Sequence, residues 1–225
     1  MRTDFHRQLD LLNADLAAMC DLAATAIRRA TDALLHTDLG AAEHALGGIE
    51  QLRRLNLNVD RRALSLLARQ APVAGDLRAV VSAVQIGADA DRMGGLAAHV
   101  AAAVRRRHPA PVLPTQIAPR FAEMGRIAAS LADAAREVVL DGDPVAAARI
   151  RADDADMDAQ HRLLLAALST PAWCHGTPAA VDIVLLARFY ERFADHAAEI
   201  GRRVIFRSTG ANTADTQATP SDTLP

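Results

Sequence analysis

The sequence predicts an all-α protein made of two tandem, pseudo-symmetric three-helix bundles. Of its 225 residues, 51% are hydrophobic and only 3% are aromatic. The chain is rich in alanine, leucine and arginine, which have high helix propensities, whereas sheets are enriched in β-branched and aromatic residues. In addition, an acidic pattern near residue 91 recurs about 100 positions later, near residue 191. Such self-similarity indicates a duplicated structural unit.

Three long helices are expected in the first half of the chain. Apolar residues recur at spacings of three and four, the period of one helical face, so a helix is expected over residues 4–37. Asp38 is placed to cap a second helix over residues 39–70. Pro72 ends that helix because proline lacks an amide donor. A third helix is expected over residues 76–107.

The second half repeats this layout after a short linker. Three prolines mark the linker, and the pairs Asp143-Pro144 and Thr177-Pro178 are typical of a helix cap followed by proline in the first turn. The expected helices cover residues 115–140, 144–168 and 177–207. The expected domains are a first unit over residues 1–107, the linker 108–114, a second unit over 115–207 and a disordered tail over 208–225.

Charge and hydropathy exclude several classes of protein. The formal net charge is −2, which argues against nucleic-acid binding. The start of the chain lacks the apolar segment of a signal peptide, and no run of about 18 apolar residues is present that would insert into a membrane. The two cysteines, Cys20 and Cys174, indicate neither a disulfide framework nor a zinc site. A cytoplasmic protein is therefore expected.

Four acidic residues in the second half are candidate metal ligands. Glu191 and Asp195 are four residues apart, so they share one face of the last helix. Asp154 and Asp158 have the same spacing on the preceding helix, which a short connection places antiparallel to the last one. Four facing carboxylates would form a site of hard oxygen ligands, which suits Mg²⁺, Mn²⁺, Ca²⁺ or iron.

The corresponding site of the first half is weaker. Its four positions hold Asn56, Asp60, Asp91 and Gly95, which amount to two carboxylates, one amide and no fourth ligand. His99, one turn beyond Gly95, is an alternative ligand. Metal binding in the first half is therefore expected to be weak or absent. The recurrence still favours a metal site, because a duplicated surface ion-pair network has no reason to keep its register.

Two alternatives remain open at this stage. Acidic pairs on helices often form solvated ion pairs with arginine, and Arg188 and Arg192 lie near Glu191. The second alternative is a carboxylate-bridged metalloenzyme in a helical bundle. Such enzymes use Glu-x-x-His pairs, which this sequence lacks, and His161 and His175 have no partner at a ligand spacing. Motifs for a nucleophile with its base are also absent, so no catalytic residue is expected.

Several motifs resemble those of the PhoU family of phosphate-regulon proteins. Residues 69–78, RQAPVAGDLR, are similar to that family's Arg-Gln-Pro-x-Ala-x-Asp-Leu-Arg stretch, with Ala71 as one extra residue. Residues 89–95, DADRMGG, resemble its Asp-Leu-Glu-Arg-Ile-Gly-Asp motif, and residues 190–196, YERFADH, resemble the second copy. The resemblance in layout covers roughly residues 1–207.

The resemblance implies a regulatory function. Members of the family are cytoplasmic and commonly dimeric regulators, not enzymes. They act with the ATPase subunit of the phosphate ABC transporter and with the phosphate-sensing histidine kinase, and they repress the phosphate-starvation response when phosphate is ample. The resemblance therefore implies a homodimeric phosphate-signalling adaptor that is not inserted in the membrane and reaches it only through its partners.

The resemblance also implies roles for particular residues. The family carries Glu/Asp-x-x-x-Asp motifs that bind multinuclear metal clusters. Carried over to this sequence, the second motif falls on Glu191 and Asp195, and the first falls on Asp91 without its final acid. The implied ion is iron, magnesium, manganese or zinc. Asp76 and Arg78 correspond to the family's Asp-Leu-Arg stretch and are candidate contacts with a partner protein.

Overall fold

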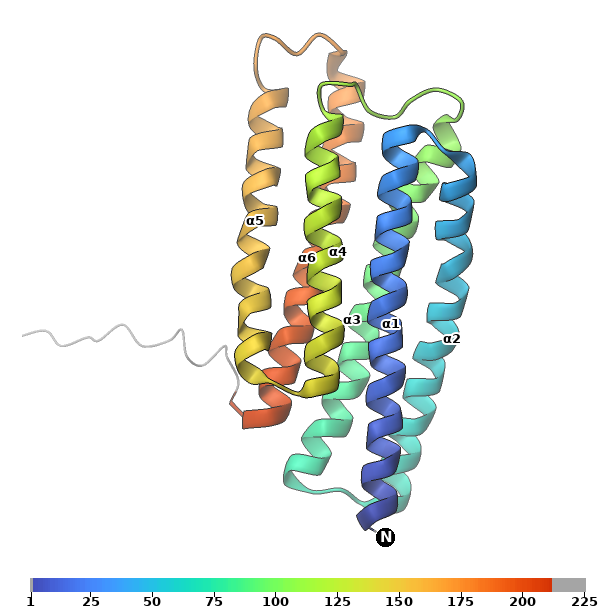
Figure 1. Cartoon of the computed structure of the whole chain (residues 1–225), viewed down its shortest axis with the longest axis vertical. Coiled ribbons are helices and arrows are strands. Elements are labelled where there is room, and N and C mark those ends of the chain that lie inside the picture. The colour runs from blue at the N-terminus through green and yellow to red at the C-terminus, as the bar shows by residue number, and fades with distance from the viewer. Residues whose placement is uncertain (1, 212–225) are drawn as a thin grey trace, which may run out of the picture.

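Six long α-helices and no strand make up the part of the chain that the computed structural model describes, residues 2–211 (Figure 1). The helices are α1 (Arg2–His36), α2 (Leu39–Gln70), α3 (Ala74–Arg107), α4 (Ala118–Asp141), α5 (Pro144–Leu168) and α6 (Gly176–Thr209). The predicted all-α class is therefore confirmed. None of these described helices is long and apolar enough to cross a membrane.

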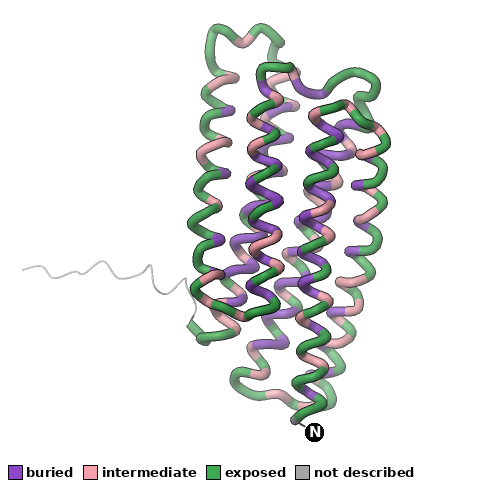
Figure 2. The backbone as a smooth tube through the Cα atoms, in the orientation of Figure 1, coloured by how far each residue is buried: buried purple, intermediate pink, exposed green. Residues whose placement is uncertain are grey.

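The helices form two three-helix groups that pack side by side. Helices α1, α2 and α3 pack against one another, and so do α4, α5 and α6. The two groups meet where α1 packs on α4 and α3 packs on α6, so that α2 and α5 lie on the outer flanks (Figure 1). Buried residues accordingly follow the inner faces of the four central helices (Figure 2). This arrangement is the predicted pair of pseudo-symmetric bundles.

Local capping explains why α2 and α5 begin where the sequence predicts and where α4 ends. The Asp38 carboxylate accepts a hydrogen bond from the Ala41 amide at 3.0 Å, which caps α2. The Asp143 carboxylate accepts one from the Val145 amide at 2.8 Å and thereby caps α5. Gly142 ends α4 in the left-handed region, at φ 69°, where glycine is not strained.

Several helix ends differ from the prediction by one to three residues. Helix α4 begins at Ala118 rather than at residue 115, because the Ile117 and Ala118 amides both donate to the Pro114 carbonyl in a preceding turn. Helix α6 begins at Gly176, where the Trp173 indole N–H donates to the Gly176 carbonyl at 2.9 Å. The same helix extends to Thr209, beyond the predicted end. The predicted disorder of residues 212–225 lies outside the described residues.

A buried tyrosine joins three helices of the core. Tyr190 of α6 is fully buried, and its hydroxyl lies 2.9 Å from Thr31 Oγ1 of α1. The Tyr190 ring packs edge-on against Phe121 of α4, with centroids 5.7 Å apart. Thr31 also donates to the Ile27 carbonyl at 2.7 Å, so the Tyr190 hydroxyl donates to Thr31. Tyr190 is therefore a core residue that lies where the two groups of helices meet.

We expect Tyr190→Phe to lower the free energy of unfolding by about 1 kcal/mol, the usual net value of one buried hydrogen bond. The ring and its packing on Phe121 are retained, so only the hydroxyl contact is lost. Urea denaturation followed by circular dichroism measures the change. Thr31→Val in the Tyr190→Phe background should cost less than Thr31→Val alone, because the shared hydrogen bond is already absent. Fully additive costs would show that the two hydroxyls do not interact.

Candidate metal centre

The four acidic residues of the second half lie along the seam between α5 and α6. Gly201 of α6 lies against Ala147 and Ile150 of α5, whereas His161, further along α5, approaches Glu191, which comes earlier in α6. The two helices are therefore antiparallel, as predicted. This register brings Asp154 and Asp158 of α5 opposite Asp195 and Glu191 of α6, and all four carboxylates are electrostatically coupled.

Burial and the charges of neighbouring carboxylates disfavour the ionised forms of Asp154 and Asp195. Burial, and after it the charges of Asp195, Asp158 and Glu191 in that order, raise the pKa of Asp154 to about 6, while the charge of Arg202 acts in the opposite direction. Burial and then the charge of Glu191 also raise the pKa of Asp195. A bound cation would stabilise the ionised forms of these two acids.

Arginines compete for part of this site. The Arg188 guanidinium lies 2.5 Å from Glu191 Oε2, in an ion pair one turn apart on α6. Two more arginines, Arg202 and Arg203, pair with Glu199. The alternative of an arginine network is thus realised for Glu191, although Arg192 has no ion pair within the described residues. After burial, the charges of neighbouring carboxylates still help to raise the pKa values of Asp154 and Asp195, so the arginines do not fully neutralise this cluster.

His161 is a site residue that the sequence analysis missed. Its Nδ1 atom lies 3.8 Å from Glu191 Oε2, and both side chains are largely buried. Asp158, three positions earlier on α5, shares a helical face with His161, but no three acidic, histidine or cysteine side chains among residues 2–211 are placed to hold a metal ion, so a ligand role for His161 stays untested. That Asp-x-x-His spacing was the available signal. His161 Nε2 is buried and has no hydrogen-bond partner among the described residues.

The first half does not reproduce this cluster. The Asn56 side-chain oxygen is buried without a hydrogen bond in the described part of the chain. This oxygen packs closely against Gly87 of α3: a Cβ atom added at Gly87 would lie only 2.8 Å from it. Asp60 and Asp91 are half-buried, and a Cβ on Gly95 would have open space around it. His99 stacks on the Phe189 ring with centroids 5.0 Å apart.

The two candidate partner contacts lie at the start of α3. Asp76 is in the first turn of that helix, where a carboxylate interacts favourably with the helix dipole. Arg78 packs against the end of α6, since a Cβ on Gly210 would lie 3.2 Å from the Arg78 guanidinium carbon. Arg78 Nε is buried and lacks a hydrogen-bond partner among residues 2–211. Arg78 therefore contacts both groups of helices, and its role toward a partner protein remains a prediction.

The side chains of the second-half cluster suit a hard metal ion in chemistry but are not gathered around one point. Among residues 2–211, no three acidic, histidine or cysteine side chains are placed to hold a metal ion. The cluster nevertheless combines four oxygen donors, an imidazole and raised carboxyl pKa values. Binding would require Glu191 to exchange its ion pair with Arg188 for the metal.

The raised pKa of Asp154 predicts a stability that falls as the pH rises. The folded protein holds a proton on Asp154 up to about pH 6, whereas the unfolded chain loses it near pH 4. The unfolding free energy should therefore decrease as the pH rises from about 4 to 6. Asp154→Asn should stabilise the metal-free protein by about 1 kcal/mol at pH 7, a figure reduced for solvent screening at this half-exposed site.

Urea denaturation in the presence of a chelator, at pH 4 and at pH 7, measures this difference. The matched control is Asp153→Asn, which changes an exposed neighbour on the same helix and should leave stability nearly unchanged at both pH values. A gain from Asp154→Asn that is equal at pH 4 and pH 7 would exclude the carboxylate charge as its cause.

Comparison with known proteins matches the chain to one family along most of its length. A family model described as the PhoU domain matches residues 16–104 and residues 121–204. The chain is 54% identical over 211 residues to the phosphate-specific transport system accessory protein PhoU homolog 2 of Mycobacterium tuberculosis, covering 94% of this chain and 99% of that protein. It is 53% identical to PhoU homolog 1 of Mycobacterium leprae, covering 94% of this chain and 95% of the relative.

Solved structures show the same fold at much lower sequence identity. The crystal structure of PhoU from Pseudomonas aeruginosa superposes with a TM-score of 0.80 at 23% identity, covering 92% of this chain and all of that one. The phosphate transport system regulatory protein PhoU from Streptococcus pneumoniae gives a TM-score of 0.77 at 22% identity, with 92% of this chain covered. The six-helix arrangement is thus retained where most side chains differ.

Proposed function

As this chain belongs to the PhoU family, we propose that it is a phosphate-signalling adaptor that represses the phosphate-starvation response and phosphate uptake when phosphate is ample. It acts by contacting the ATPase subunit of the phosphate ABC transporter and the phosphate-sensing histidine kinase. Its role is regulatory rather than enzymatic, and we further propose that it works as a homodimer.

The observation that carries this proposal is the identity of 54% to an accessory protein of phosphate-specific transport, over 94% of this chain and 99% of the relative. An alignment of that extent includes both three-helix groups, their connection and the acidic seam between α5 and α6. The relatives at 48% to 54% identity are likewise named as transport accessory proteins, which supports an adaptor over the alternative metalloenzyme.

We propose that the second-half cluster binds a metal ion, namely iron, magnesium, manganese or zinc. Asp154, Asp158, Glu191 and Asp195 would supply oxygen ligands. A cation there would offset the burial and the mutual repulsion that raise the pKa of Asp154. The consequence for this chain is mechanical: a metal would hold α5 against α6 and would free Arg188 from Glu191, which changes the charge on the outer surface of α6.

Complementation of a bacterial strain that lacks its own PhoU protein tests the proposed function. We expect the full chain to restore repression of a phosphate-starvation reporter in ample phosphate and to leave the reporter inducible when phosphate is removed. The double variant Glu191→Gln/Asp195→Asn in the same strain tests whether the acidic cluster contributes. A reporter that stays active while the folded chain accumulates would contradict the repressor role.

Affinity purification of the tagged chain tests the partners separately. In phosphate-replete cells, the transporter ATPase subunit and the sensor kinase should be recovered with the wild-type chain. Asp76→Asn and Arg78→Gln should reduce recovery of at least one partner if these residues contact it. Recovery of neither protein from cells in which the reporter is repressed would show that the chain acts through other partners.

A further inference from the structure

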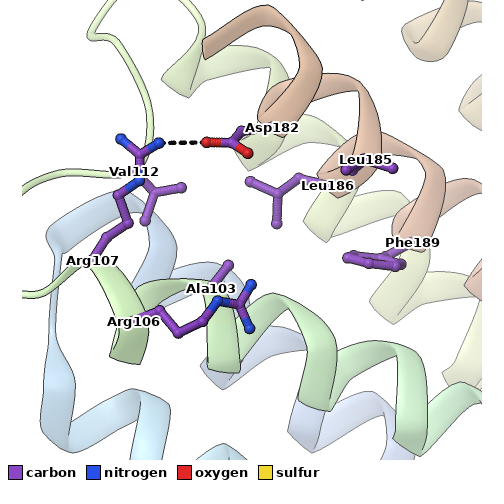
Figure 3. A pocket seen from close by; sticks show the side chains of 8 residues that line it. All are labelled: Ala103, Arg106, Arg107, Val112, Asp182, Leu185, Leu186 and Phe189. Atoms are coloured by element: carbon purple, nitrogen blue, oxygen red, sulfur yellow. Dashed lines mark hydrogen bonds and ion pairs between the residues drawn. The ribbon is translucent and has the colours of Figure 1, made fainter. Parts of the chain in front are cut away.

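A pocket opens between the end of α3, the linker and the start of α6 (Figure 3). Its volume is about 330 Å³, which lies at the lower end of the range of small-molecule sites. Its apolar wall is formed by Ala103, Val112, Leu185, Leu186 and Phe189. Stacking on His99 positions the Phe189 ring. The pocket therefore has an apolar wall built from three segments of the chain.

The charged rim of the pocket is positive because one arginine is not neutralised. Helix α3 ends with three consecutive arginines. Arg105 pairs with Glu43 at 3.7 Å, and Arg107 pairs with Asp182 at one end of the pocket (Figure 3). Arg106 lies across from Leu186 in the same view, and within residues 2–211 it makes no ion pair or side-chain hydrogen bond. Two guanidinium groups and one carboxylate leave one net positive charge.

We propose that this pocket binds a small organic anion with a compact apolar body and one carboxylate or phosphate group. The apolar body would pack on Leu186, Val112 and Phe189, and the anionic group would accept hydrogen bonds from the Arg106 guanidinium, whose fixed fork suits carboxylates and phosphates. The helix dipole explains why arginines occur at the end of α3. The dipole does not explain why Arg106, the arginine without an ion pair, borders an apolar pocket.

The pocket is separate from the carboxylate cluster and does not depend on the proposed regulatory function. Its residues lie on the side of α6 that packs on α3, whereas Glu191 and Asp195 interact with residues of α5. Its volume of about 330 Å³ admits one short apolar chain or ring, which favours a free organic acid over a two-chain lipid. A ligand here would touch both three-helix groups and their linker.

Titration of the isotope-labelled full chain with octanoate, followed by NMR, tests the proposal. We expect saturable shifts of the Ala103, Val112 and Leu186 amides, with a dissociation constant of about 10 µM to 1 mM, the range of a small ligand with few polar contacts. Arg106→Gln should weaken octanoate binding about tenfold through loss of the charged hydrogen bonds. Octanol should bind more weakly than octanoate and should be insensitive to Arg106→Gln.

The matched control is Arg105→Gln, which removes the same charge from the adjacent position outside the pocket and should leave octanoate binding unchanged. Ala103→Phe, which fills the pocket from its wall, should abolish the shifts at Val112 while the spectrum otherwise remains that of a folded protein. The proposal is overturned if the shifts do not saturate, if Arg105→Gln weakens binding as much as Arg106→Gln, or if inorganic phosphate alone displaces octanoate at equal concentration.

Discussion

Replacing Gly201 with alanine is expected to lower the free energy of unfolding by about 1–2 kcal/mol, although alanine is the better helix former. The reason is the close approach of α5: a Cβ at position 201 would lie 2.8 Å from the Ala147 carbonyl oxygen and 3.5 Å from Ile150 Cδ1. A backbone carbonyl in a helix does not move aside as a flexible side chain does. The two helices must therefore separate, at a cost typical of an overpacked core.

Gly95→Ala is the matched control and should change stability in the opposite direction. Gly95 is also in the interior of a long helix, but a Cβ there would have no atom within 4 Å. Alanine should stabilise the folded protein by about 0.5–1 kcal/mol through helix propensity alone. Thermal and urea denaturation of the two variants measure the difference. Destabilisation of equal size at both positions would show that the α5–α6 approach is not the cause.

The helices were predictable from the sequence because their signals are local. Apolar spacing, the caps at Asp38 and Asp143 and the break at Pro72 each act within a few residues, and the structure places α2 as predicted. The start of α4 was less predictable, since the turn at Pro114 satisfies amides that would otherwise begin a helix. Ala71, the extra residue in the motif, ends α2 at φ 43°. This left-handed conformation is unfavourable for alanine, so the sequence does not predict it.

The candidate site was predictable only in part, because its remaining partners come from other helices. The four acids followed from a spacing of four, and the electrostatic coupling of Asp154 with the others supports their grouping. The approach of His161 to Glu191 depends on the register of α5 against α6, which no single helix encodes. The burial of Asn56 against Gly87 in the first half likewise depends on how α2 meets α3.

Metal content is expected to depend on the second half of the chain and hardly at all on the first. Glu191→Gln/Asp195→Asn removes two anionic oxygen donors from the four-carboxylate group along the α5–α6 seam. Metal affinity should fall by on the order of 10–100-fold. Losing a group that merely supports a metal ligand has an effect of this size, and losing two ligands should have at least the same effect. Asp91→Asn should have little effect, because two of the four corresponding first-half positions hold an amide, Asn56, and a glycine, Gly95. Elemental analysis of purified proteins equilibrated with buffered iron, magnesium, manganese or zinc measures both.

Arg188→Gln distinguishes a metal site from an arginine network. If Glu191 is a ligand held away from the metal by its ion pair with Arg188, removing the guanidinium should raise metal affinity, and the variant should bind more metal than the wild type at low free concentration. Binding by every variant that retains Asp154 should weaken below about pH 6, where this carboxyl holds a proton. Equal metal loss from the first-half and second-half substitutions would contradict the asymmetry. Metal loss from Arg188→Gln would instead show that Arg188 stabilises the metal-bound protein. It would contradict the idea that its ion pair keeps Glu191 from the metal.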